Sequence, residues 1–444
     1  MSAQWMVDGE SQYDMFAWDV ARFGNWADKA FTKARVGDQY AKRFAIHFPN
    51  EEREAGRPVR TRPIHALQQA LGGVFGLNYG WEHVQWFADA PGVKDTNGFT
   101  RQNWFEPVGR ECRMLRENAG IIDISNFAKY RVRGPKAGDW LNSIFANNMP
   151  KAVGCSCLTP LIGVRGGIAG DFTVTRLADD EFMVIGSGMA ERYHQRFWNM
   201  VPMPEGMSFE SLTETMCGFN VAGPKSRELL QRLTNTSLAT ADFPFMRSKW
   251  IELAGVDCLA LRVSFTGDLG WELHCRTEDQ LRLYQALLDA GKTFSAGPVG
   301  GRALMSLRVE KGYGSWSREY SPEYWPQEVG LASLIKLDKE FLHKQAYLAI
   351  KCNPPREILS IVEILDVSVA DATGGEPIFD KAGNGVGRVT SGSYGYGVNK
   401  SLALCYLKNV APGDELDVMI LGIPHQAVVL AEPPFDPSGA KLRG

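Results

Sequence analysis

Two stretches of the chain, RVRGPKAGDWLNSIF (residues 131–145) and NVAGPKSRELLQRLT (residues 220–234), decide the predicted fold. In each stretch a strand-like segment ends at Gly-Pro, and a helix then begins with large apolar residues at helical spacing. Gly134 aligns with Gly223, so the two stretches read as copies of one unit. The repeat predicts two related α/β halves, and the alternative is a chance similarity around Gly-Pro-Lys.

The segments that follow the two copies share one order of strands. GDFTVTRLADDEFMVIG (170–186) follows the first copy, and VDCLALRVSFTGDLGWELHC (256–275) follows the second. Each contains two strand-like runs, separated by an acidic turn at residues 179–180 and at residues 266–268. This shared order weakens the chance explanation. Two related halves that face each other predict a ligand cleft between them.

Two helices are predicted after the second half, over residues 277–291 and 301–313. In the first, Thr277 and Gln280 have the spacing of a capping box, and Gly291 is suited to end the helix. The apolar residues expected to share one face of this helix are Leu281, Tyr284 and Leu288.

The rest of the chain predicts a loop and then a separate β domain. Residues 316–328 contain two prolines and are predicted to form an irregular loop. From about residue 355 onward the sequence turns to short strands broken by glycine, which is typical of a small closed β-barrel. The predicted fold class is therefore α+β with several domains. The predicted divisions are residues 1–105, 106–350 and 351–444.

The composition is that of an ordinary globular protein of several domains. At 444 residues the chain is too long for one core, and a net charge of −3 gives no overall attraction to nucleic acid or an anionic membrane. No apolar run is long enough to span a bilayer, and residues 1–16 are too polar and acidic for a secretory signal. We therefore expect a cytoplasmic protein with no nucleic-acid partner and no membrane partner.

The eight cysteines do not form a recognisable metal or redox motif. The only close pair is Cys155 and Cys157, whose spacing is shorter than the two-residue gap typical of zinc knuckles and redox motifs. The sequence also has no HExxH motif, no EF-hand loop, no phosphate-binding GxxxxGK[ST] loop and no dinucleotide fingerprint. We expect reduced cysteines that pack as small hydrophobic residues, and no metal.

The N-terminal region is rich in aromatic residues and arginine. Its last part crowds five aromatic side chains into a short span: Phe75, Tyr79, Trp81, Trp86 and Phe87. Such density indicates either a packing surface against another domain or chain, or ordinary burial.

Seven motifs, in order along the chain, resemble those of the glycine-cleavage T-protein (aminomethyltransferase) family. They are GIIDISNFAKYRVRGP, RGGIAGDFTVTRLADDEF, FNVAGPKSRELL, FPFM, RVSFTGDLGWELH, SLRVEKGY and RVTSGSYGYG. The chain is more closely similar to the C-terminal, folate-binding half of the dimethylglycine and sarcosine dehydrogenases. HFPNEEREAGRPVR (47–60) and YGWEHVQWFA (79–88) resemble the region that connects their flavin and folate domains, although the flavin-binding glycine motif is missing. The resemblance implies a T-protein-like cloverleaf around a folate cavity.

The resemblance implies tetrahydrofolate as the cofactor and assigns roles to particular residues. A carboxylate can accept both the ring N–H and the amino group of a pterin, and Glu272 matches the family glutamate that does so. Asp171 matches the family aspartate beside the folate nitrogens that receive the carbon, as a charge stabiliser or proton acceptor. For the bare sequence, Glu272 could be a solvent-facing strand residue and Asp171 a turn cap. Further residues assigned to the cofactor are Arg308, Gly167, Phe245, Trp316 and Tyr394.

One segment departs from the family pattern where the donor substrate is expected. The family has a tyrosine and an asparagine or aspartate there, whereas LTPLIG gives Leu158 and Gly163, and we assign Phe127 to the same pocket. Losing these polar groups favours a more apolar methylated donor. Three activities stay open: direct methyl transfer from a small N-, O- or S-methylated donor, formation of 5,10-methylene-tetrahydrofolate with a separate flavin-containing oxidoreductase, and folate binding without catalysis.

Overall fold

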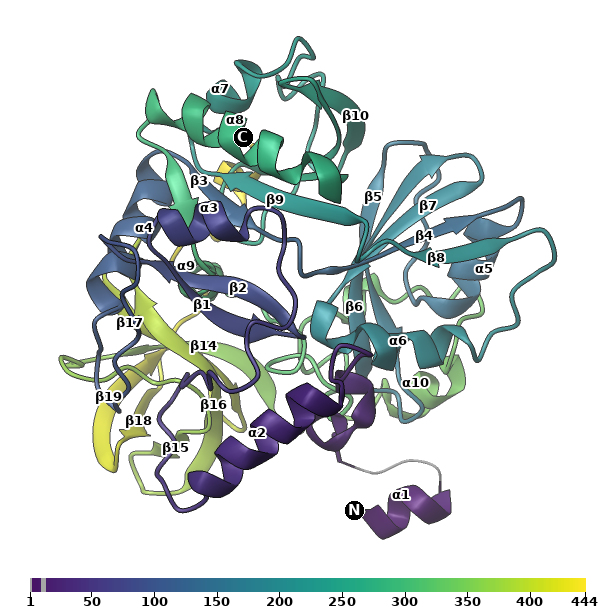
Figure 1. The fold of residues 1–444 in the computed structure, drawn as a ribbon. Coiled ribbons are helices and arrows are strands. Elements are labelled where there is room, and N and C mark those ends of the chain that lie inside the picture. The colour runs from purple at the N-terminus through teal and green to yellow at the C-terminus, as the bar shows by residue number, and fades with distance from the viewer. Residues whose placement is uncertain (1, 9–12) are drawn as a thin grey trace.

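The computed structural model describes residues 2–8 and 13–444, and it consists of two sheet-based halves, a C-terminal barrel and an N-terminal segment (Figure 1). Residues 1 and 9–12, which belong to the N-terminal stretch judged too polar for a secretory signal, lie outside the described residues. Among the described residues, no helix is long and apolar enough to cross a membrane.

The first half is a five-stranded antiparallel sheet in the order β5-β6-β7-β4-β8. Its elements are β4 (Ala128–Arg133), α5 (Ala137–Ile144), β5 (Ser156–Ile162), β6 (Ile168–Ala178), β7 (Glu181–Gly186), η3 (Gly188–Ala190), α6 (Glu191–Trp198) and β8 (Ser208–Ser211). Phe172 and Val174 on β6 and Phe182 and Val184 on β7 point into its hydrophobic core, under α5 and α6. Because side chains alternate along a strand, the residues between them face the opposite side of the sheet.

The second half is a six-stranded sheet in the order β10-β11-β12-β9-β3-β13, antiparallel except for the β13–β3 pair. Its elements are α4 (Phe105–Glu117), β3 (Gly120–Asp123), β9 (Met216–Ala222), α7 (Ser226–Gln231), β10 (Ser248–Leu253), β11 (Val256–Leu261), β12 (Gly270–Arg276), η4 (Thr277–Asp279), α8 (Gln280–Lys292), β13 (Gly297–Val299) and α9 (Gly301–Glu310). On β12, Trp271 and Leu273 are fully buried in the core that α7 and α8 cover.

The predicted repeat is confirmed by these elements. In the first half β4 leads through Gly134 into α5, and in the second half β9 leads through Gly223 into α7. Both glycines have a positive φ, 131° and 124°. A Cβ on Gly223 would lie 2.4 Å from the Leu115 carbonyl oxygen, so the strand-to-helix turn needs a glycine for space as well as for conformation.

The two sheets face each other across a small apolar contact. Met183 and Ile185 on β7 pack with Leu259 and Leu261 on β11 in one buried cluster, and Phe127 packs against its edge. These residues are on the faces of the sheets that point away from their own helix-covered cores. These are the faces that would line the ligand cleft predicted between the halves, and that cleft stays a prediction.

Part of the prediction for the helix at 277–291 is wrong. The α-helix begins at Gln280, its N-cap is Asp279, and no side chain caps it, because the Thr277 hydroxyl donates to the Glu214 carbonyl oxygen instead. Leu281 is 37% exposed, and the residues that face the core are Gln280, Leu283, Tyr284, Leu287 and Gly291. The following helix ends at Glu310 rather than at residue 313.

The C-terminal domain is the predicted closed barrel, in the order β14-β17-β16-β15-β18-β19. Its strands are β14 (Ile358–Ile364), β15 (Pro377–Asp380), β16 (Gly385–Gly395), β17 (Lys400–Leu407), β18 (Glu415–Ile420) and β19 (Ile423–Val429). The loop 316–328 is irregular, as predicted, and η5 (Ala332–Leu334) and α10 (Lys344–Ile350) connect it to the barrel. A final helix, α11 (Ala440–Arg443), follows.

The N-terminal region contains α1 (Ser2–Asp8), η1 (Phe16–Trp18), η2 (Val20–Arg22), α2 (Lys29–Ala41), α3 (His65–Ala70), β1 (Gly73–Asn78) and β2 (Trp81–Phe87). The division at residue 105 stays a prediction. Ile64 belongs to the core of the six-stranded sheet, and Val74 and Trp86 pack in one cluster with α4 and α9. By contrast, α2 has no buried residue and lies along the outside of the molecule (Figure 1).

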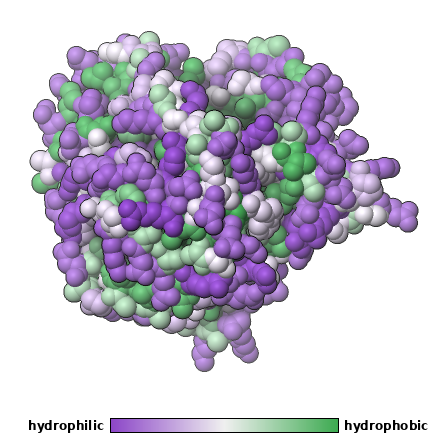
Figure 2. Space-filling model, turned by 90° about the horizontal axis from the view of Figure 1, so that it is seen from above, coloured by the Kyte–Doolittle hydropathy of each residue, from purple (hydrophilic) through white to green (hydrophobic). Residues whose placement is uncertain are grey.

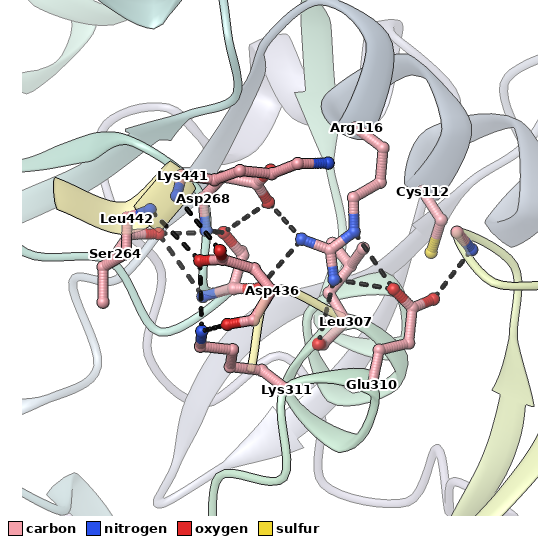
Figure 3. A network of polar contacts seen from close by, with 12 residues as sticks. Cys112, Arg116, Ser264, Asp268, Leu307, Glu310, Lys311, Asp436, Lys441 and Leu442 are labelled. Atoms are coloured by element: carbon pink, nitrogen blue, oxygen red, sulfur yellow. Dashed lines mark hydrogen bonds and ion pairs between the residues drawn. The ribbon is translucent and has the colours of Figure 1, made fainter. Parts of the chain in front are cut away.

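A buried ion cluster joins α4, α9 and the loop before β12 (Figure 3). The Arg116 guanidinium donates to Asp268 and, at 2.6 Å, to Glu310, and all three side chains are at most 6% exposed. Burial raises the pKa of Asp268 to about 6. Beside this cluster Lys311 binds Asp436 in the C-terminal segment, so the polar contacts run from the second half to the end of the chain.

Candidate functional site

Asp171 lies on the face of the first sheet that points toward the second half. Its neighbour Phe172 is in the core of the first half, so the Asp171 side chain is on the opposite face of β6. Two positions along the strand, Thr173 pairs with Ile185, which belongs to the contact between the sheets. Burial raises the pKa of the Asp171 carboxyl to about 6, and no basic side chain forms an ion pair with it among the described residues.

Glu272 lies on the corresponding face of the second sheet. Its neighbours Trp271 and Leu273 are in the helix-covered core, as their alternation predicts, and Glu272 pairs across the sheet with Leu261 of the inter-sheet contact. The Glu272 side chain is 17% exposed, and its Oε2 lies 3.5 Å from Nε2 of His274. No lysine or arginine within the described part of the chain binds this carboxylate, so its oxygens are available to accept hydrogen bonds.

The strand registers therefore place both acids on the two sheet faces that meet at the inter-sheet cluster. Asp171 comes from the first half and Glu272 from the second, and the cluster of Met183, Ile185, Leu259 and Leu261 joins these faces. The loop between β3 and β4 passes from one sheet to the other. In this loop both side-chain amide atoms of Asn126 are buried without a hydrogen-bond partner, which leaves an unused donor and acceptor near the site.

Of the residues assigned to the substrate pocket, Leu158 and Phe127 lie on or beside these faces. Leu158 pairs with Thr173, so it shares the inner face of the first sheet, and it is 39% exposed. Phe127 packs against both the inter-sheet cluster and the cluster around α4. Gly163 is buried and donates its N–H to the Gly167 carbonyl oxygen at 2.8 Å. Their role in binding a donor stays a prediction.

The loop 316–328 packs close to β6. Trp316 is 6% exposed, and its ring centroid lies 5.0 Å from that of His194, which contacts Phe172 on the helix-covered face opposite Asp171. The Tyr320 phenol has a raised pKa, mainly from burial and in addition from the Asp171 charge. At Gly167, a Cβ would lie 2.1 Å from the Pro322 carbonyl oxygen, so this glycine admits the loop backbone.

Arg308 holds the same loop in place. Its guanidinium, fully buried, donates to Glu319 at 2.8 Å and to the Tyr313 carbonyl oxygen at 2.9 Å, and it also donates to Ser391 of the barrel. Only its Nε lacks a partner. Most of the donors that were expected to meet a folate carboxylate are therefore engaged inside the protein, and a folate contact of Arg308 stays a prediction.

The remaining cofactor candidates lie elsewhere. Tyr394 and Arg308 line a cavity of about 190 Å³ between residues 95–104, α9 and the barrel strand β16, where Tyr394 packs against Phe105. Phe245 is partly buried in the segment that connects the two halves, since the neighbouring Met246 bonds to both Ser156 and Arg262 through its backbone. The residues that the motifs assigned to the cofactor therefore lie in more than one part of the structure.

Sequence reasoning missed a buried lysine beside Glu272. Lys129 is fully buried on β4, and its Nζ donates to the Ser125 and Phe127 carbonyl oxygens, both at 2.9 Å. Burial and the nearby Arg62 charge lower its pKa to about 8, while Glu272 opposes this shift. In the sequence Lys129 looks like Arg131 and Arg133 of the same alternating strand, so no local signal marked it as the buried one. In the described part of the chain, no group of His, Cys, Asp or Glu side chains could hold a metal ion.

Facing sheets with an acid on each inner face, together with a closed barrel, define a protein of the aminomethyltransferase fold. The sequence model described as the GCVT N-terminal domain matches residues 64–339, and that of the glycine cleavage T-protein C-terminal barrel domain matches residues 361–436. The chain therefore belongs to the glycine cleavage T-protein family, whose cofactor is tetrahydrofolate. A third model, the FAD dependent oxidoreductase central domain, matches residues 8–61.

Individual relatives agree with this assignment. The chain is 34% identical to mitochondrial dimethylglycine dehydrogenase of Mus musculus, over 99% of this chain and 51% of the relative. It is 32% identical to a formaldehyde-forming 4-methylaminobutanoate oxidase of Paenarthrobacter nicotinovorans, over 100% of this chain and 54% of the relative. The chain thus spans about half the length of these two relatives. The aminomethyltransferase T structure from Bartonella henselae has the same fold, with a TM-score of 0.74 at 22% identity, and the match covers 85% of this chain and 98% of that one.

Proposed function

We propose that this protein is a tetrahydrofolate-dependent transferase that moves a methyl group from a small N-, O- or S-methylated donor to the folate. The observation that carries the proposal is the placement of Asp171 and Glu272 on the two sheet faces that meet at the inter-sheet cluster. Tetrahydrofolate supplies the nitrogen nucleophile that takes up the carbon. The protein fits it, because Glu272 has a partly exposed carboxylate free of any cationic partner among the described residues.

Each acid has a separate task in this reaction. Glu272 accepts the paired N–H donors of the pterin and so orients the cofactor. Asp171 stabilises positive charge on the reacting nitrogen and takes up its proton, and a pKa of about 6 suits both tasks near neutral pH. As the new bond to the methyl carbon forms, the donor's bond to that carbon breaks, and its N, O or S atom leaves with the electron pair and takes up the proton. Holding the two reactants in line between the sheets supplies further acceleration.

We propose that the donor is a small methylated molecule with an apolar surface next to its methyl group. Leu158, on the inner face of the first sheet, and the side-chain-free Gly163 stand where the family pattern has polar groups. A pocket without these groups forms no hydrogen bond to an amine. It can bind a methylated donor without leaving a buried polar group unpaired.

The test is to incubate the purified protein with tetrahydrofolate and candidate methyl donors and to identify the folate product by mass. Formation of 5-methyl-tetrahydrofolate without any flavoprotein supports the proposal. Product that forms only with an added oxidase, as 5,10-methylene-tetrahydrofolate, supports the second candidate below. Tetrahydrofolate binding without turnover in either condition would show a non-catalytic folate-binding module.

The second candidate is the folate-binding part of a dimethylglycine- or sarcosine-type dehydrogenase that works with a flavoprotein. It is favoured by the match of residues 8–61 to an oxidoreductase domain and by exposed apolar side chains in the same segment. Trp18 is 79% exposed, Phe44 94% and Ile46 70%. On the face of the molecule drawn in Figure 2, hydrophilic residues predominate and hydrophobic residues form scattered patches. Side chains of this size are normally covered, and we propose an FAD-dependent oxidoreductase module as the cover.

Replacing Trp18, Phe44 and Ile46 by serine is expected to abolish association with a flavoprotein while leaving tetrahydrofolate binding unchanged. The measurement is flavin absorbance that comigrates with the protein in gel filtration after coexpression with an FAD-dependent oxidoreductase of the same organism. The matched control replaces Leu421 and Ile423, which are exposed in the barrel turn, and should retain the complex. If both variants retain the same amount of flavin, the proposal that this surface binds the flavoprotein is wrong.

Replacing Glu272 by alanine is expected to weaken tetrahydrofolate binding by about 10- to 100-fold, since hydrogen bonds to a charged group are lost. Turnover at saturating folate should fall much less, because the reacting nitrogen is served by Asp171. Calorimetric titration and steady-state kinetics measure the two effects. The control is Glu278→Ala, at an exposed carboxylate paired only with Arg276. Unchanged affinity in Glu272→Ala would contradict the assignment of the pterin to Glu272.

A further inference from the structure

His274 lies directly behind Glu272 on the inner face of β12. The two residues are two positions apart on one strand, so their side chains point to the same side of the sheet. His274 is fully buried, whereas Glu272 is partly exposed, and Nε2 of the ring lies 3.5 Å from Oε2 of the carboxylate. The imidazole is thus the inner neighbour of the carboxylate that we propose for the pterin.

The ring has no other polar partner in the part of the chain that the structure describes. Both ring nitrogens are buried without a close hydrogen bond, and Nδ1 faces the backbone of Gly218 on β9. A Cβ on Gly218 would lie 2.8 Å from Nδ1, so the glycine makes the space that the ring occupies. Leu259 is the residue opposite His274 on β11. A buried polar ring in such surroundings gains from any hydrogen bond it can form, and only Glu272 is within reach.

The charge state of the ring follows from the same surroundings. Burial lowers the pKa of His274, the Glu272 charge opposes this, and the Lys129 ammonium lowers it further. The imidazole is therefore neutral near pH 7. A neutral imidazole carries one N–H, and since no acceptor faces Nδ1, the proton is placed on Nε2, toward Glu272.

We propose that His274 is a positioning residue, which donates Nε2–H to Oε2 of Glu272 and fixes the plane of this carboxylate for the paired donors of a reduced pterin. This inference rests on the proposed function of Glu272. Without a fixed plane the carboxylate rotates about its last torsion, which has a broad energy minimum. Hydrogen bonds of this kind are often long in the unliganded protein and shorten in the complex, in agreement with the present 3.5 Å.

The test compares two ligands that differ only at the pterin donors: tetrahydrofolate and its 2-desamino-2-methyl analogue, which lacks the amino group. We expect the wild-type protein to prefer tetrahydrofolate. His274→Leu and His274→Asn should reduce this preference about tenfold, because neither presents an N–H at the position of Nε2. His274→Gln should keep it within about threefold, since its amide nitrogen reaches that position. A merely structural histidine would lower the affinity for both ligands alike.

The outcomes separate this inference from the proposed function. Thermal melting identifies any variant that does not fold, and the Asn and Gln variants, which are both polar and both small enough for the space, still decide the question if the Leu variant is unstable. If Glu272→Ala loses the preference and all folded His274 variants retain it, the positioning role of His274 is overturned. If the wild-type protein shows no preference, or Glu272→Ala keeps it, the proposed function of Glu272 fails and His274 with it.

Discussion

Asp171→Asn is expected to lower kcat by about 100- to 10,000-fold, which is the usual contribution of a positioned acid or base. Asparagine has the shape of aspartate but cannot take up a proton or carry the negative charge that stabilises a cationic nitrogen. Binding of tetrahydrofolate should change little, because we propose that Glu272 on the opposite sheet holds the pterin. The matched control is Asp179→Asn, at a carboxylate that is 97% exposed in the turn after the same strand.

The pH dependence of this reaction follows from the raised pKa of Asp171. The carboxylate is protonated below about pH 6 and ionised above it, so kcat of the wild-type protein should rise through that pH and then level off. Asp171→Asn should show no such rise in its remaining activity. A fully active variant, or an unchanged rise with pH in the variant, would remove Asp171 from the chemistry.

Stability should change in the opposite direction from activity. The folded state holds the Asp171 proton more tightly than the unfolded state, whose pKa is near 3.8, so this group lowers stability as the pH rises from about 4 to about 6. Asparagine has no charge to bury. Asp171→Asn should therefore melt at a higher temperature than the wild-type protein at pH 7, and this difference should disappear below about pH 4.

Arg116→Ala is expected to lower the free energy of unfolding by about 3–5 kcal/mol, the cost of leaving buried carboxylates without their cation. Asp268 and Glu310 would both keep their positions inside the protein (Figure 3), and among the described residues only the Thr266 hydroxyl and the Gly397 N–H would still donate hydrogen bonds to these carboxylates. The measurement is the midpoint of thermal or urea unfolding at pH 7.5. The control is Arg276→Ala, which breaks an ion pair with Glu278 that is about 70% exposed on both sides and should cost at most about 1 kcal/mol.

A second variant separates charge from packing in this cluster. Asp268→Asn combined with Glu310→Gln removes both negative charges, so adding Arg116→Met to that pair should restore much of the stability that Arg116→Ala loses. Lower pH should also reduce the loss in Arg116→Ala, because burial already raises the pKa of Asp268 to about 6 and protonation removes its charge. If Arg116→Ala and Arg276→Ala have the same unfolding midpoint, the buried cluster does not hold the domains together.

The sequence predicted the elements that depend on short-range patterns. The Gly-Pro turns at Gly134 and Gly223, the strand pairs after them and the closed C-terminal barrel are all confirmed, because strand alternation and turn chemistry are local. The capping box at Thr277 failed for a tertiary reason, since the Thr277 hydroxyl bonds to the Glu214 carbonyl oxygen from another part of the chain.

The candidate site divides in the same way. Motif spacing and the alternation of Trp271, Glu272 and Leu273 were enough to place Glu272 opposite the core, and the resemblance pointed to Asp171. Which surface each acid faces depends on strand register and on the packing of β7 against β11, which join residues far apart in the sequence. The same holds for Arg308, whose pairing with Glu319 and Ser391 spans three parts of the fold.

By itself the sequence determined the family, the order of elements and the cofactor class, because these rest on local periodicity and on motifs that occur in family order. It also proposed the two acids. Only the tertiary structure decided that both acids lie on the sheet faces that meet between the halves, that Lys129 and His274 lie buried near Glu272, and that Arg308 binds Glu319 in the loop 316–328. The physical reason is that burial, and with it each raised or lowered pKa, arises from contacts between segments distant in sequence.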